Sequence, residues 1–327
     1  MKFALMVPFL LLGLGLHIDV RAMPIIIKYS HVVADVTPKG QAAIKFKELA
    51  EKKLAGKVQI QVFPNSQLFG DDKEMQALLL GDVQIIAPSL SKFDQYTHQL
   101  QIFDLPFLFD NMAAVERFQA SPHGQSLLTS LSTKGIYGFG YLQNGMKQLS
   151  ANTPLYRPQD AKGLTFRIQS SDVLDAQFRA VGAKPKKIPF SEAYLAMKTR
   201  LVDGAENPWS NIYSQHFHEV QPYIMDSNHG VLAYMVIGNA KWWNALPPDI
   251  QKGLSEAMAE SIRFGNQVAH DEEATFRSHV MAQKHVHVLP LNADQLQLWR
   301  TAMQPVWKKF EQDIGQDLIQ AALQANR

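Results

Sequence analysis

The chain of 327 residues contains no cysteine. This absence excludes disulfide bonds, thiolate metal sites, cysteine nucleophiles and the acylated cysteine of a lipoprotein anchor. An excess of one charge sign is also missing, because 32 Lys and Arg stand against 30 Asp and Glu and the formal net charge is +2. A protein that neutralises a run of phosphates needs more positive charge than this. We therefore expect no nucleic acid among its partners.

Motifs of the common enzyme classes are absent as well. The sequence has no GxSxG, no P-loop and no HExxH, and its two GxG spacings lack the third glycine of a dinucleotide site. Two carboxylate pairs, Asp71 with Asp72 and Asp203 with Glu206, are explained more simply by cap and turn roles than by acid–base chemistry. We expect no enzyme activity and no cofactor.

Two His-x-His pairs, His216 with His218 and His285 with His287, are candidate metal ligands. Such a pair can place both imidazoles on one face of a strand. Neither pair has an evident nearby carboxylate or third histidine in the sequence, so we expect no metal site.

The N-terminus has the pattern of a signal peptide over residues 1–22. Lys2 supplies a positive start, residues 3–16 are apolar, and Val20-Arg21-Ala22 resembles a signal peptidase site. An apolar stretch of 14 residues is shorter than the roughly 20 that a membrane-spanning helix needs. We expect cleavage after Ala22, export to the periplasm, and a mature chain without a membrane span.

The mature chain is long enough for two domains, because one domain typically takes roughly 150 residues. Periodicity predicts strands and helices in alternation. In the first half, strands are expected at 25–30, 58–63 and 83–87 and helices at 41–54 and 71–80. In the second, strands are expected at 136–142 and 164–169 and helices at 171–181 and 191–199, the last capped by Ser191. This order predicts an α/β fold with a largely parallel sheet.

One helix stands out by its length. Pro247-Pro248 opens an uninterrupted helical pattern that runs to about Lys284. At 1.5 Å per residue such a helix spans about 50 Å, more than the width of one domain. We expect it to lie across both domains, followed by a strand at 286–291 and two closing helices.

Six phrases in the sequence resemble one family closely. They are Phe63-Pro-Asn-Ser-Gln-Leu-Phe-Gly-Asp71, Phe103-Asp-Leu-Pro-Phe107, Asn144-Gly-Met-Lys-Gln-Leu-Ser150, Gly163-Leu-Thr-Phe-Arg-Ile168, Pro189-Phe-Ser-Glu-Ala-Tyr194 and Val202-Asp-Gly-Ala-Glu-Asn-Pro208. In this order they resemble the DctP-type binding proteins of TRAP transporters. The lysine at position 147 resembles the C4-dicarboxylate branch of this family, because relatives that bind sialic acid carry arginine at that position.

The resemblance implies a periplasmic binding protein fold of two α/β lobes with a hinge and a long helix spanning both lobes. Lobe I would comprise residues 23–144 plus about 232–265, and lobe II residues 145–231 plus about 266–327. The ligand, a C4-dicarboxylate such as succinate, malate or fumarate, would lie in the cleft between them. The lobes would close over it and present it to the membrane subunits of the transporter. We expect the protein to act as a monomer.

The resemblance also implies the ligand contacts. Arg167 would clamp a carboxylate, which suits the two parallel donors of a guanidinium. Lys147, expected on the adjacent strand, would be the second cation, and Asn207, Phe190 and Trp209 would complete that side of the pocket. The first lobe would contribute His31, Lys39, Ser89 and Ser91, with Tyr234 from the second hinge crossing.

Two other functions remain open at this point. A family member that binds a keto or aromatic acid would keep Arg167 and change the remaining contacts. A periplasmic receptor for a signalling protein would bind the same ligand without a transporter.

Overall fold

The computed structural model describes residues 23–327, so the predicted signal peptide lies outside the described residues. The strands are β1 (Ile25–Ser30), β2 (Val58–Phe63), β3 (Ile85–Ile86), β4 (Ile136–Ala151), β5 (Thr165–Ile168), β6 (Lys184–Lys187), β7 (Gly204–Asn207), β8 (Tyr223–Asn239) and β9 (His287–Pro290). The α-helices are α1 (Pro38–Lys53), α2 (Glu74–Leu80), α3 (Met112–Ala120), α4 (Pro122–Thr129), α5 (Asp172–Ala180), α6 (Ala193–Lys198), α7 (Trp209–Ser214), α8 (Ala240–Asn244), α9 (Pro248–Met281), α10 (Ala293–Met303), α11 (Pro305–Ile314) and α12 (Gln316–Gln324). Short 3₁₀ turns are η1 (Leu90–Lys92), η2 (Gln99–Asp104), η3 (Ser132–Lys134), η4 (Pro158–Ala161), η5 (Phe190–Glu192) and η6 (Phe217–Glu219).

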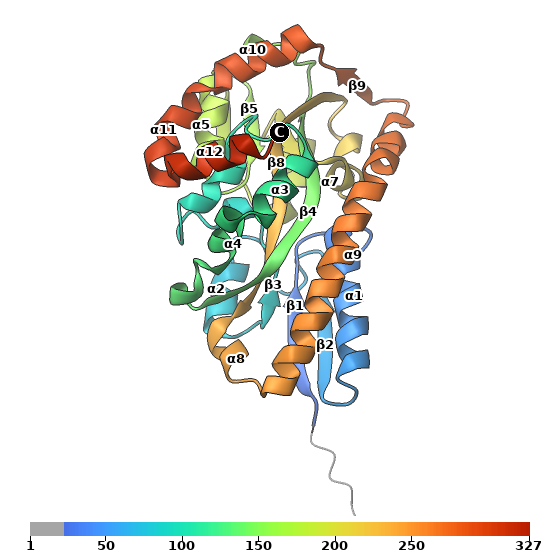
Figure 1. The fold of residues 1–327 in the computed structure, drawn as a ribbon. Helices are drawn as coiled ribbons and strands as arrows, with labels where there is room; N and C mark the ends of the chain where they lie inside the picture. The colour runs from blue at the N-terminus through green and yellow to red at the C-terminus, as the bar shows by residue number, and fades with distance from the viewer. Residues whose placement is uncertain (1–22) are drawn as a thin grey trace, which may run out of the picture.

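The strands form one mixed sheet with helices around it, which confirms the predicted α/β fold (Figure 1). Its order is β2-β1-β3-β8-β4-β7-β5-β6, and β9 pairs with β8. The pairs β1–β2, β1–β3, β5–β6, β5–β7 and β8–β9 are parallel. The prediction of a largely parallel sheet is wrong at its centre, where β8 runs antiparallel to β3 and β4, and β4 antiparallel to β7.

The two central strands, β4 and β8, are 16 and 17 residues long and cross the whole molecule (Figure 1). The sequence predicts only 136–142 for the first and no strand for the second. The polar residues after Leu142 interrupt the alternation, and the pairing has register shifts at Gly138/Gly140, Gln143/Gly145 and Lys147/Leu149. Bulges of this kind bend a strand without ending it.

Local signals account for most of the other elements. β1 and β2 have the predicted bounds. The Thr37 hydroxyl accepts the Gly40 amide in the first turn of α1, and the Ser171 hydroxyl accepts the Leu174 amide in the first turn of α5. The cap predicted at Ser191 is wrong, because η5 begins at Phe190 after Pro189, and α6 follows without a side-chain cap.

The long helix α9 has 34 residues and is confirmed. Toward its N-terminus it packs against α1, and Gly265 approaches so closely that an added Cβ would lie 2.6 Å from the Cβ of Ala42. Toward its C-terminus Phe276 and Val280 belong to a core cluster with Phe190. The helix therefore connects the two ends of the molecule.

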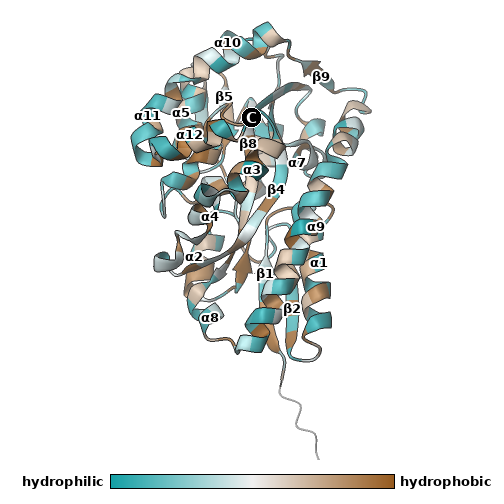
Figure 2. Cartoon of the chain, viewed as in Figure 1, coloured by the Kyte–Doolittle hydropathy of each residue, from teal (hydrophilic) through white to brown (hydrophobic). Residues whose placement is uncertain are grey.

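Three helices, not the predicted two, close the chain. Pro305 begins α11, and Gly315, at φ 105°, separates α11 from α12. The apolar sides of α11 and α12 join the large core cluster around Phe103, whose ring packs against Phe109 and Phe118, whereas α10 joins a separate cluster. Teal hydrophilic residues alternate with paler and brown ones along α9, α10 and α11, and brown hydrophobic residues are frequent on the inner strands (Figure 2).

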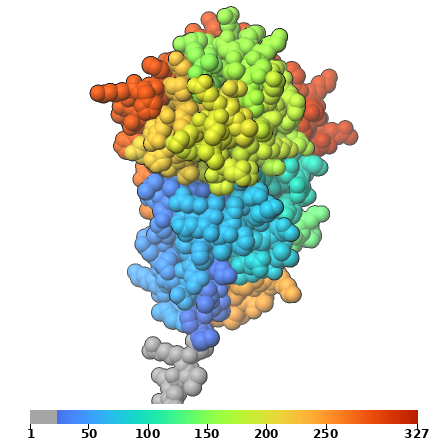
Figure 3. Space-filling view, turned by 180° about the vertical axis from the view of Figure 1, so that it is seen from behind, coloured from blue at the N-terminus to red at the C-terminus, as the bar shows by residue number. Residues whose placement is uncertain are grey.

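The predicted lobe boundaries stay a prediction, because strands from both predicted lobes belong to one continuous sheet. From behind, the blue surface of the N-terminal residues meets the yellow surface of later residues along a seam across the middle of the molecule (Figure 3). The side chains discussed next lie at junctions between these two parts of the sequence.

Candidate functional site

Arg167 lies on β5 and is 1% exposed. Its Nε donates to the Ile188 carbonyl at 2.9 Å, whereas Nη2 has no hydrogen-bond partner among the described residues. The guanidinium carbon is 5.7 Å from the ring centre of Phe190. Burial lowers the pKa of Arg167, and the negative charges of Asp71 and Glu206 oppose this effect. A buried cation with a free donor is costly unless an anion approaches it.

A narrow cavity has Phe190 among its walls, the residue on whose ring the Arg167 guanidinium packs, but Arg167 itself is not a wall residue. Five of its wall residues were predicted as ligand contacts: Lys39, Ser89, Phe190, Asn207 and Tyr234. The others are Val32, Val33, Asp71, Glu74, Lys92, Gln169, Asn211 and Leu232. The Nδ2 of Asn207 is a second buried donor without a partner among the described residues.

Lys39 brings a positive charge to one wall of the cavity. Its ammonium lies 3.7 Å above the Tyr234 ring centre and donates to the Ala87 carbonyl at 3.0 Å. Burial lowers the pKa of Lys39 to about 8, against the opposing effect of Glu74 and Asp71. Burial likewise raises the pKa of Glu74 to about 8. At neutral pH this wall therefore carries a lysine cation beside a largely protonated carboxyl group.

Asp71 joins two segments that are far apart in sequence. It pairs with Lys92 at 2.7 Å, and its Oδ1 accepts the backbone amide of Phe190 at 3.0 Å. Burial alone would raise the pKa of Asp71, but the charges of Lys92 and Arg167 outweigh burial and lower it. From the sequence, only a cap or turn role was expected for Asp71, although it ends one of the six family phrases.

Neutral groups hold the remaining walls in place. Asn144 on β4 donates to the Tyr234 hydroxyl at 2.7 Å and to Oδ1 of Asn211 at 3.1 Å. Ser210 donates to the side chain of Asn144. Ser89 donates to Gln169 at 3.3 Å. These bonds connect β4, α7 and β8 around the cavity.

Lys147 is not among the cavity walls. Its ammonium pairs with Glu206 at 2.7 Å and lies 4.0 Å from Asp104, with all three side chains buried. His229 also contacts Glu206, at 2.8 Å. Burial alone would raise the pKa of Glu206, but Lys147 and His229 hold it at about 2. The position predicted for Lys147 also needs correction, because β7 lies between β4 and the strand of Arg167.

Four other predicted contacts also lie outside the cavity wall, namely Arg167, described above, and Ser91, Trp209 and His31. Ser91 donates to Asp104 at 2.6 Å. Trp209 is buried, with the Arg277 guanidinium 5.6 Å from its ring. His31 is fully buried, and its pKa is lowered to about 3 by burial and by Lys39, so its imidazole is neutral.

Five polar wall residues were missed: Asp71, Glu74, Lys92, Gln169 and Asn211. Sequence spacing offered a signal for two of them, because Lys92 directly follows Ser91 and Asn211 lies one helical turn after Asn207. Nothing in the local sequence distinguishes Glu74 from a surface residue on an amphipathic helix.

Within residues 23–327, no helix has the length and apolar character that a membrane crossing requires.

A cation-lined cavity with walls from residues 32–92 and 169–234, beside two long crossing strands, is typical of a solute-binding protein. The model of the DctP family, bacterial extracellular solute-binding protein family 7, matches residues 29–313. The chain belongs to this family.

Several relatives match this chain over nearly its whole length. The C4-dicarboxylate-binding periplasmic protein DctP of Shewanella loihica is 53% identical, over 96% of this chain and 93% of the relative. A TRAP periplasmic solute-binding protein from Shewanella oneidensis with bound succinate has 56% identity and a TM-score of 0.92, covering 93% of this chain and 100% of that one. A counterpart from Pseudomonas aeruginosa PAO1 with bound L-malate has 48% identity and a TM-score of 0.85, covering 88% and 100%.

Proposed function

We propose that this protein captures a C4-dicarboxylate in the periplasm and delivers it to the membrane subunits of a TRAP transporter. The observation that carries this proposal is a cavity walled by Lys39, Lys92 and Asn207, whose Nδ2 has no hydrogen-bond partner among the described residues. A second buried donor without such a partner, Arg167 Nη2, belongs to a guanidinium that packs on the wall residue Phe190. The names of the relatives supply the ligand class and the transporter. Export would follow the predicted cleavage after Ala22.

The charge of the site supports a dianion. Arg167, Lys39 and Lys92 contribute three positive charges, and Asp71 contributes one negative charge. Glu74 is largely neutral at pH 7, since its pKa is about 8. The surplus of two positive charges balances the two carboxylates of succinate or malate.

Each carboxylate has its own set of donors in this proposal. The free edge of Arg167 holds the first carboxylate, with the amide of Asn207 beside it. Lys39 and Lys92 attract the second, in place of Lys147, whose charge is already neutralised by Glu206. Phe190 supplies an apolar wall for the carbon chain.

A thermal-shift comparison of acids tests the function. At micromolar affinity the binding free energy is about −8 kcal/mol, and ligand at about 1,000 times Kd stabilises the fold by about 4 kcal/mol. Succinate, malate or fumarate should therefore raise Tm strongly, and butyrate, with one carboxylate, far less. Mass spectrometry of the acid that co-purifies provides an independent identification. Stabilisation by sugars or amino acids alone would contradict the proposal.

A further inference from the structure

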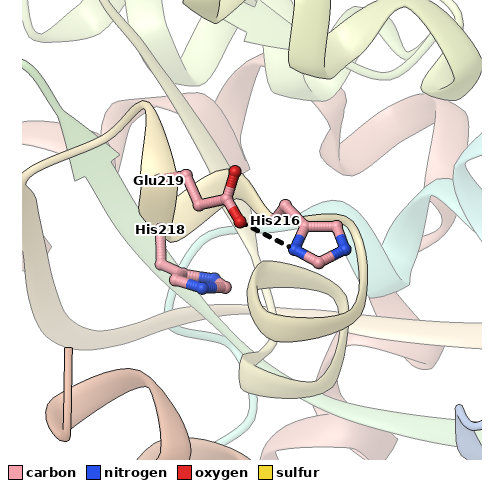
Figure 4. Close-up of side chains that lie close together, drawn as sticks. All are labelled: His216, His218 and Glu219. Carbon is pink, nitrogen blue, oxygen red and sulfur yellow. Dashed lines mark ion pairs between the residues drawn. The ribbon is translucent and has the colours of Figure 1, made fainter.

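A turn outside the ligand cavity brings two imidazoles and a carboxylate together. It lies between α7 and β8 and contains His216, His218 and Glu219 (Figure 4). Each of these side chains offers one ligand atom, and the three atoms all lie within 4.8 Å of one another. The premise that His216 and His218 lack a nearby carboxylate was wrong, because Glu219 directly follows His218.

The backbone of the turn positions His216. This residue has φ 58°, in the left-handed region, where histidine occurs more often than most side chains. Its Nδ1 lies 3.0 Å from Oε1 of Glu219. Figure 4 shows the imidazole directed toward the carboxylate, with the ring of His218 on the same side of the turn.

His218 is held in the form that binds metals. Its ring is 4% exposed and stacks on Tyr213, with the ring planes 15° apart. Nδ1 lies 3.1 Å from the Ile212 carbonyl, which can only accept a hydrogen bond. Nδ1 must therefore carry the hydrogen, and the lone pair of Nε2 is left for a ligand. A carbonyl that fixes the second ring nitrogen is the usual support of a metal-binding histidine.

We propose that His216, His218 and Glu219 bind one divalent transition-metal ion, with Zn²⁺ as the reference ion. Two imidazole nitrogens and one carboxylate oxygen form a donor set that Zn²⁺ accepts, with a fourth position for water. The exposed side chains of His216 and Glu219 can adjust to the metal, whereas His218 is already oriented. A simple exposed ion pair of His216 with Glu219 would not require the orientation of His218.

Calorimetric titration of metal-free, tag-free protein with Zn²⁺ tests this site. Wild type should bind one Zn²⁺ saturably, with Kd below about 100 µM, which corresponds to more than about 5 kcal/mol of binding free energy. His216→Asn removes the imidazole and keeps a residue that tolerates the left-handed backbone. Glu219→Gln removes the carboxylate charge at nearly constant shape. Each variant should bind Zn²⁺ at least tenfold more weakly.

The exposed pair His270 and Asp271 provides the matched control. Its Nδ1 to Oδ1 distance of 3.1 Å is close to that of His216 and Glu219, and neither residue belongs to the three-ligand cluster. His270→Asn should leave the Zn²⁺ affinity within twofold of wild type. Absence of saturable binding by wild type, or unchanged affinity in His216→Asn, would overturn the proposal. Folding of each variant is checked by circular dichroism, and Zn²⁺ should raise Tm in wild type and in His270→Asn only.

Discussion

Replacement of Arg167 by lysine separates a planar clamp from a simple positive charge. The lysine keeps the cation near Asp71 but loses the Nε bond to Ile188 and the second parallel donor for a carboxylate. A charge-assisted hydrogen bond contributes roughly 1.5–3 kcal/mol, and about 1.4 kcal/mol corresponds to tenfold in affinity. We therefore expect Arg167→Lys to bind the best diacid about ten- to a hundredfold more weakly.

The assay is calorimetry of wild type and variant with that diacid, beside circular dichroism as the check of folding. Arg277→Lys is a suitable control, because Arg277 also makes two hydrogen bonds to one carboxylate, at 3.2 and 2.9 Å from Asp226. Its guanidinium packs on Trp209, which is not a cavity wall residue, whereas that of Arg167 packs on the wall residue Phe190. The diacid affinity of Arg277→Lys should stay within twofold of that of wild type. A well-folded Arg167→Lys protein that binds within threefold of wild type would refute the clamp.

The two buried lysines should respond differently to methionine. Lys39→Met should weaken diacid binding at least tenfold with little loss of stability, whereas Lys147→Met should cost about 3–5 kcal/mol in urea unfolding, because it leaves Glu206 buried without its cation. The reverse result would restore Lys147 as the ligand contact. Diacid affinity should also fall as the pH rises above 8, because Lys39 loses its charge and Glu74 becomes negative. Each of these two proton losses can lower the affinity by up to about tenfold per pH unit. Calorimetry at pH 7, 8 and 9 measures this slope, and an affinity independent of pH would contradict both pKa assignments.

The local pattern of the sequence determined the secondary structure where one face of an element is buried. The alternation in β2 and the long apolar stripe of α9 follow from the 2.0 and 3.6 residue periods, which do not depend on the partner element. The six phrases also identified the family, and half of the expected ligand contacts line the cavity.

The tertiary structure decided which charges meet. Lys147, Glu206 and Asp104 come from β4, β7 and η2, and their pairing neutralises a lysine that the sequence offered as a ligand contact. Asp71 acquires its place at the cavity through the amide of Phe190, 119 residues away. Coulomb energies depend on distance and burial, and both are set by long-range packing instead of by sequence spacing. For the same reason the proximity of Glu74 to Lys39, and the shared pKa near 8, appear only after the chain has folded.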